Sequence, residues 1–124
     1  MSFYRCEHCG NVASPVVNGG GELTCCGEPM KLMKANTTDA ATEKHVPVVN
    51  VEGNKVVVNV GSVDHPMTAE HLINFIVIET TLGRQYKGLT PEDKPHAEFI
   101  LQDGEKILAA YEYCNLHGLW KVEV

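Results

Sequence analysis

The chain has 124 residues, of which 44% are hydrophobic and 21% charged, a composition typical of one globular domain, or of a small domain beside a mini-domain. Ten basic and sixteen acidic side chains give a formal net charge of −6, which argues against nucleic acid or an anionic membrane as a partner. No apolar run approaches the roughly 18 residues of a membrane-spanning helix. Residues 1–6 show no export signal, so we expect a soluble protein of the cytoplasm.

The first 36 residues contain four of the five cysteines and no long strand or helix pattern. Such a segment is too short to build an apolar core, so a cross-link or a metal must stabilise it. Clustered thiols in a reducing cytosol bind metal more often than they form disulfides. Residues 36–42 are polar and small, which indicates a linker. The sequence therefore predicts two domains, 1–36 and 37–124.

The second domain shows a succession of short β patterns. Gly53-Asn54 and Asp103-Gly104 are both typical of tight hairpin turns. The run at 72–78 is continuously apolar, as expected for a strand buried on both faces. About seven short strands predict an all-β, antiparallel sandwich or barrel. The apolar runs lie at 46–51, 56–60, 72–78, 97–101, 107–113 and 119–124.

The amino-terminal cysteines are Cys6 and Cys9, two residues apart, followed by the adjacent pair Cys25 and Cys26. A Cys-x2-Cys turn lets two thiolates bind one ion, and four thiolates complete a site. A structural zinc site is one interpretation. Neighbouring cysteines bend the regular tetrahedral angles, which favours the alternative, a redox-active iron that keeps its ligands as it exchanges one electron. His8 lies between two ligands of a complete set, so we expect it to be exposed and not to bind metal.

A second group combines the fifth cysteine with histidines near the ends of predicted strands. A lone histidine is usually a hydrogen-bonded structural group, but several beside a free thiol favour a metal site. Four imidazoles and one thiolate fill five positions around an iron and leave a sixth open for substrate. His96 lies in a polar turn and is interpreted as a surface group. The candidate ligands are His45, His65, His71, Cys114 and His117.

Two other classes of protein use similar residues. A copper electron carrier of the cupredoxin type combines a β-sandwich with a Cys-x2-His loop, but it needs an axial methionine soon after that histidine, and residues 118–124 contain none. A zinc-binding interaction module would leave the histidines without a role. A rubredoxin-like electron-transfer protein without catalysis is the remaining alternative.

The chain resembles desulfoferrodoxin, the two-iron form of superoxide reductase, over nearly its whole length. Residues 6–26 look like the desulforedoxin iron centre, for which the adjacent cysteine pair is characteristic. The other three motifs of the family follow in its order, at residues 43–45, 65–71 and 114–118. The resemblance implies a small rubredoxin-like domain followed by an immunoglobulin-like sandwich.

The resemblance also implies two irons per chain. The first would be held by Cys6, Cys9, Cys25 and Cys26. The second would have four histidines (His45, His65, His71, His117) in a plane and Cys114 on the axis. Its ferrous form would give one electron to superoxide, and two protons would complete hydrogen peroxide. A rubredoxin or similar donor would restore the ferrous state, and the chain would form a homodimer.

Three residues near the second centre have expected roles beyond simple ligation. Lys44 would attract anionic superoxide to a protein of net charge −6. Glu43 matches the family residue that occupies the sixth position once the iron is oxidised. Backbone amides of Leu116 and His117 would donate hydrogen bonds to the Cys114 sulfur and moderate its donation to iron. The amino-terminal iron is either an electron relay or a structural centre.

Overall fold

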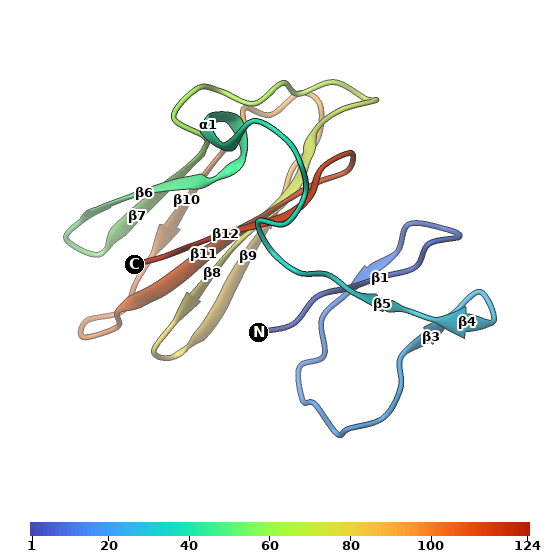
Figure 1. The fold of residues 1–124 in the computed structure, drawn as a ribbon. Helices are drawn as coiled ribbons and strands as arrows, with labels where there is room; N and C mark the ends of the chain where they lie inside the picture. Colours follow the sequence, from blue (N-terminus) through green and yellow to red (C-terminus); the bar gives the residue numbers. More distant parts are fainter. The chain divides into compact units, whose positions relative to one another are not determined.

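The structure, a computed structural model, describes all 124 residues and divides them into two compact units, Met1–Lys34 and Ala35–Val124 (Figure 1). Nearly all of the regular structure is β-strand, as the sequence predicts. No helix has the length and apolar character that crossing a bilayer requires.

The first unit contains five strands of two residues each. Strands β2, β1 and β5 form one antiparallel sheet, and β3 and β4 form a second. Strands this short bury little apolar surface, which agrees with the expectation that a bound metal stabilises the unit. The strands are β1 (Tyr4–Arg5), β2 (Val12–Ala13), β3 (Thr24–Cys25), β4 (Glu28–Pro29) and β5 (Lys31–Leu32).

The second unit is a sandwich of two antiparallel sheets, with strand orders β10-β7-β6 and β12-β11-β8-β9 (Figure 1). The predicted antiparallel sandwich is confirmed. One turn of helix, α1 (Thr42–His45), leads into the first sheet. The strands are β6 (Pro47–Glu52), β7 (Lys55–Val60), β8 (Ile73–Thr80), β9 (Gly83–Gly88), β10 (His96–Ile100), β11 (Ile107–Cys114) and β12 (Gly118–Glu123).

A single apolar core lies between the two sheets. Strands β7 and β8 supply six of its thirteen buried residues. Along β7 these are alternate residues, because every second side chain of a strand faces the same way. Strand β8 is buried on both faces from Phe75 to Ile78, as its continuous apolar run predicts. The core includes Val56, Val58, Val60, Ile73, Ile76, Ile78 and Cys114.

Three features of the second unit differ from the sequence predictions. Strand β9 was missed because it is an edge strand with mostly exposed residues, so no apolar alternation marks it. Helix α1 lies partly in the predicted linker and is too short to show a period. Asp103-Gly104 does not form a hairpin, because β10 pairs with β7 while β11 pairs with β8 and β12. That turn instead carries the chain from one sheet to the other.

Strand register brings distant segments together at one end of the sandwich. The start of β6 meets the end of β7, because Pro47 pairs with Val60. In the other sheet, Cys114 at the end of β11 pairs with Ile73 and with Gly118. The segments 42–46, 61–72 and 114–118 therefore converge at this end, on a frame of paired strands.

Candidate metal centres

The four cysteines of the first unit form one cluster, in which all four sulfurs lie within 4.8 Å of one another. The Cys9 and Cys25 sulfurs are 3.6 Å apart, and those of Cys25 and Cys26 are 3.9 Å apart. Two thiolates about 2.3 Å from one tetrahedral ion would lie about 3.8 Å apart. The sulfur spacing therefore fits a single four-thiolate metal ion.

Tight turns place these sulfurs. In the first turn, the Gly10 amide donates to the Cys6 carbonyl at 2.9 Å, and Gly10 has a φ of 81°. In the second, Cys26 itself adopts a φ of 54° before Gly27. A positive φ is uncommon for cysteine. The adjacent pair thus reaches one ion through an unusual backbone conformation as well as through side-chain rotation.

The thiols of this cluster differ in acidity. The pKa of Cys6 is lowered to about 6, chiefly because the Cys9 backbone N–H donates to its sulfur. The pKa of Cys26 is raised to about 12, because it shares hydrogen bonds with Cys9 and the other thiols. Cys6 therefore loses its proton readily, whereas Cys26 resists becoming a second thiolate beside the other sulfurs. A cation among the sulfurs removes that resistance, as metal binding to thiolates requires.

The second cluster is a closed cycle of four imidazole rings. Each ring contacts the next nearly edge to face, with interplanar angles of 77° to 88° and centroids 4.6 to 5.1 Å apart. The order around the cycle is His45, His65, His71, His117. This arrangement has the shape of four equatorial ligands around one central position.

Hydrogen bonds fix which nitrogen faces the centre in two of the rings. His45 Nδ1 donates to the Ala41 carbonyl and His65 Nδ1 to the Pro66 carbonyl, both at 2.7 Å, so their Nε2 atoms are left for a metal. His71 Nε2 is buried without a partner. His117 presents Nδ1, which lies 3.1 Å from His45 Nε2. Two ligands about 2.1 Å from one ion at a right angle would be about 3 Å apart.

Burial keeps the rings in the form that binds metal. It lowers the pKa of His65 to about 4, and it also lowers the pKa of His45 and of His71. These three imidazoles are therefore neutral at pH 7. Each retains a lone pair for a cation.

Cys114 completes this cluster from the core side. Its side chain is fully buried, and its sulfur lies 3.5 Å from His65 Nε2 and 3.8 Å from His117 Nδ1. Burial raises the pKa of Cys114, whereas backbone N–H groups of Leu116 and His117 donate to the sulfur and oppose that rise.

A cavity of about 250 Å³ opens on the imidazole cycle. Its lining includes all four histidines but not Cys114. Lys44 is its one lysine or arginine, and the side chain is exposed. Glu43 is also exposed and does not line the cavity, so the structure does not bring its carboxylate into the cluster. The other lining residues are Ala40, Ala41 and Pro66.

Two residues that sequence reasoning missed support the ligands. The Trp120 ring stacks on His45, with centroids 5.0 Å apart, and its indole N–H donates to the His117 carbonyl at 3.0 Å. The Asn115 side chain accepts from the Leu72 amide and donates to the Glu70 carbonyl, which ties the His71 loop to the end of β11. Asn115 lies within the motif at residues 114–118, but no feature of the sequence indicated a role for its side chain.

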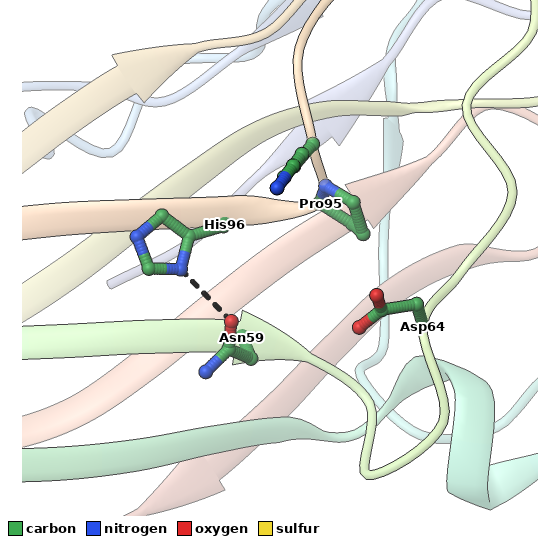
Figure 2. A pocket seen from close by; sticks show the side chains of 5 residues that line it. Asn59, Asp64, Pro95 and His96 are labelled. Atoms are coloured by element: carbon green, nitrogen blue, oxygen red, sulfur yellow. Dashed lines mark hydrogen bonds between the residues drawn. The ribbon is translucent and has the colours of Figure 1, made fainter.

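The remaining histidines lie outside both clusters. His8 is exposed and 3.0 Å from Glu28, as expected for a non-ligand. His96 is partly exposed, and its ring bonds to Asn59 and Glu98 at 2.9 and 3.1 Å. Figure 2 shows His96 facing Asn59 beside a separate hollow that Asp64 also lines. The expectation of a surface group is correct, although His96 is held by two partners.

The structure also bears on the copper alternative. Met67 is the methionine nearest to a predicted ligand, and its sulfur accepts the Ile73 amide at 3.4 Å while the side chain packs on the core. It does not belong to the second cluster. The cluster therefore lacks the weak axial thioether of a typical copper carrier.

Two family models match the chain. Residues 1–33 match the desulfoferrodoxin N-terminal domain, and residues 37–123 match desulfoferrodoxin. The chain belongs to the desulfoferrodoxin family. Both clusters lie within the matched segments.

Two of the relatives from other organisms are similar along nearly the whole chain, and a third matches two thirds of it. A desulfoferrodoxin of Nitratidesulfovibrio vulgaris is 51% identical over 98% of this chain and 94% of its own. The crystal structure of the superoxide reductase from Treponema pallidum aligns with a TM-score of 0.83 and 39% identity, covering 98% of both chains. A superoxide reductase of Pyrococcus furiosus is 36% identical and matches 66% of this chain and 87% of its own.

Proposed function

We infer that this chain is a superoxide reductase that binds two iron ions and converts superoxide to hydrogen peroxide at its second centre. The observation that carries this conclusion is the closed cycle of four imidazoles, with the Cys114 thiol on the buried side and a cavity on the other. That donor set leaves one open position for a small substrate. Family membership and the names of the Treponema and Pyrococcus relatives support it.

The ligands of the second centre would be His45, His65, His71, His117 and Cys114. When bound there, ferrous iron supplies the single electron that, with two protons, converts superoxide to hydrogen peroxide. Burial favours the neutral imidazoles, and hydrogen bonds to the Ala41 and Pro66 carbonyls orient the rings of His45 and His65. The backbone amides of Leu116 and His117 oppose the rise in the pKa of the Cys114 thiol, which favours the thiolate that binds metal.

Lys44 would serve the capture of the substrate. Superoxide is an anion, and the chain has a net charge of −6, so the average field repels it. Lys44 is the one lysine or arginine on the cavity lining, so it supplies a local attraction. Fields focused by a cleft raise association rates by roughly 10- to 1,000-fold, most strongly at low ionic strength. Lys44→Ala should slow capture by about tenfold or more while leaving the iron spectrum intact.

For Glu43 we propose a role in the oxidised, resting protein only. Its carboxylate is exposed and outside the cavity lining, so approach to the open position would need a rearrangement of α1. Glu43→Ala should therefore alter the spectrum of the oxidised protein but leave the rate of superoxide capture unchanged. A slowed capture would contradict this role.

The first centre would be held by Cys6, Cys9, Cys25 and Cys26. Cys9 and Cys26 are exposed, so a donor protein such as rubredoxin can approach the sulfurs closely. We propose such a donor, a homodimeric assembly and a cytoplasmic location, which suits a chain of five free thiols. Light scattering and reduction by rubredoxin under anaerobic conditions test the first two proposals, and cell fractionation tests the third.

The decisive experiment combines metal analysis with product stoichiometry. Protein purified without air should contain about two irons per chain and yield one hydrogen peroxide per superoxide, without oxygen. Oxygen release with half that peroxide would indicate dismutation instead. Cys114→Ala should abolish the reaction and the absorption of the thiolate-bound iron. One zinc per chain would favour a binding module, and one copper would favour an electron carrier.

A further inference from the structure

Gly61 lies against the backbone of the turn that carries Lys44. It follows β7 directly, is buried and has a φ of 77°. A Cβ atom added to Gly61 would lie 2.3 Å from the Glu43 carbonyl oxygen and 2.7 Å from Lys44 Cα. Both contacts are with backbone, which cannot swing aside as a side chain can. Only glycine allows the two segments to approach this closely.

Two hydrogen bonds hold the same contact. The Val63 amide donates to the Glu43 carbonyl at 3.0 Å, and the Ser62 hydroxyl donates to the same oxygen at 3.3 Å. We call Gly61, Ser62, Val63 and the Glu43 carbonyl the clamp. The clamp joins the loop leading to His65 to the turn that ends in His45. It thus links two segments of the second centre that are about 20 residues apart in the sequence.

The turn is anchored at its end by the buried His45 ring, but the helix itself does little to fix residues 43 and 44. Helix α1 contains four residues and has no side-chain cap at its start. Isolated helices of this length are unstable, because the conformational entropy lost in forming the first turn exceeds the stabilisation from its one hydrogen bond. The Lys44 side chain is exposed and forms no ion pair. Its place beside the cavity therefore depends on how the backbone at 43–45 is held.

We propose that Gly61 is a positioning residue, which acts through the clamp to hold Lys44 beside the open face of the second centre. This inference rests on the proposed role of Lys44 in superoxide capture. With the clamp intact, the ammonium group stays near the cavity mouth. When Gly61 gains a Cβ, the turn must move outward and the local attraction for the anion weakens.

The test compares Gly61→Ala with Gly104→Ala in the full-length, iron-loaded protein. Gly104 has a φ of 83°, and a Cβ there meets nothing within 4 Å. The control therefore imposes the same backbone strain without the collision. Capture is measured per bound iron at low ionic strength, alone and combined with Lys44→Ala. Amide exchange of residues 41–46, followed by mass spectrometry, reports on the turn independently of activity.

We expect Gly61→Ala to slow capture and to speed exchange at 41–46, whereas Gly104→Ala changes neither. The double variant should react no more slowly than Lys44→Ala alone, because both changes remove one attraction. An unchanged capture rate in Gly61→Ala would overturn the proposal. It would also be overturned if the double variant showed the product of the two separate reductions in capture rate. An unchanged rate in Lys44→Ala would reject the role of Lys44 itself. If Lys44→Ala slows capture and Gly61→Ala does not, only the role of the clamp is rejected.

Ser62→Ala provides a second variant should Gly61→Ala not fold. It removes one hydrogen bond of the clamp at an exposed position without crowding the backbone. It should speed exchange at 41–46 and slow capture in the same direction, by a smaller factor than Lys44→Ala. No change in either quantity would overturn the proposal.

Discussion

Glu112 is an acidic residue in the interior of the sandwich. Its side chain is fully buried on β11, and neither carboxylate oxygen has a hydrogen-bond partner. Burial raises the pKa of Glu112 well above its ordinary value. A buried, unpartnered polar group typically costs about 1 to 3 kcal/mol. The carboxyl group of Glu112 therefore lowers the free energy of unfolding of the sandwich.

Replacing Glu112 with methionine should thus maintain or increase stability. Methionine is unbranched and of similar length, so it fills the site without unpaired oxygens. We expect the free energy of unfolding to rise by about 1 to 3 kcal/mol in urea titrations. Ile76→Ala, at the position paired with Glu112 on β8, is the control and should cost about 2 to 5 kcal/mol. Marked destabilisation by Glu112→Met would contradict the prediction.

At the residue level, the sequence spacing of cysteines and histidines predicted the metal ligands, but it did not predict the residues that position them. Ligands have few chemical alternatives, so Cys-x2-Cys and Cys-x2-His are visible in the sequence. Trp120 and Gly61 act through stacking and through a backbone approach that only the folded chain creates. Neither effect has a local sequence signature, so both residues look like ordinary members of a β domain.

Among the elements, the contact between β7 and β10 includes an ion pair with a histidine beside it. Lys55 Nζ lies 2.7 Å from one Glu98 oxygen, and His96 Nε2 lies 3.1 Å from the other. Lys55, and then His96, lower the pKa of Glu98 below its ordinary value of 4.5. Since β10 is an edge strand that pairs only with β7, the Lys55–Glu98 pair, which joins the two strands, reinforces this single ladder.

The lowered pKa of Glu98 sets the direction of a pH effect. Its contribution to stability is fully present above about pH 4.5, the unfolded value, and is lost as the pH falls through the lower folded pKa. Glu98→Gln should therefore lower the melting temperature slightly at pH 7, and the difference should shrink as the pH falls further below 4.5. Glu92→Gln, in the exposed loop before β10, is the control. A pH-independent difference would contradict the electrostatic explanation.

Elements with a buried face were predictable, and elements without one were not. Strand β8 is buried on both sides, and its apolar run was unmistakable. Strand β9 pairs only with β8 at the edge and exposes nearly every residue. The Asp103-Gly104 turn has hairpin chemistry, but the core requires the chain to change sheets there. Turn residues specify a local bend and not the partner of the following strand.

For the whole molecule, the two units differ in what stabilises them. The second has a continuous apolar core, whereas the first has strands of only two residues around its cysteines. Each metal cluster uses ligands from one unit alone. The two metals should therefore be separable by substitution.

Cys26→Ser should remove only the first iron. We expect iron to fall from about two to about one per chain, with direct superoxide reduction retained, because the second unit supplies all five residues of its own cluster. Melting of the first unit should occur at a lower temperature, since metal binding contributes to its folding. Cys114→Ser is the complementary control, which keeps the first iron and loses the reaction. Loss of superoxide reduction in Cys26→Ser would show that the centres depend on each other.

The stacking of Trp120 on His45 has an optical consequence. Trp120 is the only tryptophan in the chain, and its ring centroid lies 5.0 Å from that of His45. Indole fluorescence is quenched by a transition metal held this close. Emission should therefore fall as the second centre fills and recover on chelation, while Cys26→Ser should leave the titration unchanged. The fluorescence of Trp120 thus reports directly on metal occupancy of the second centre.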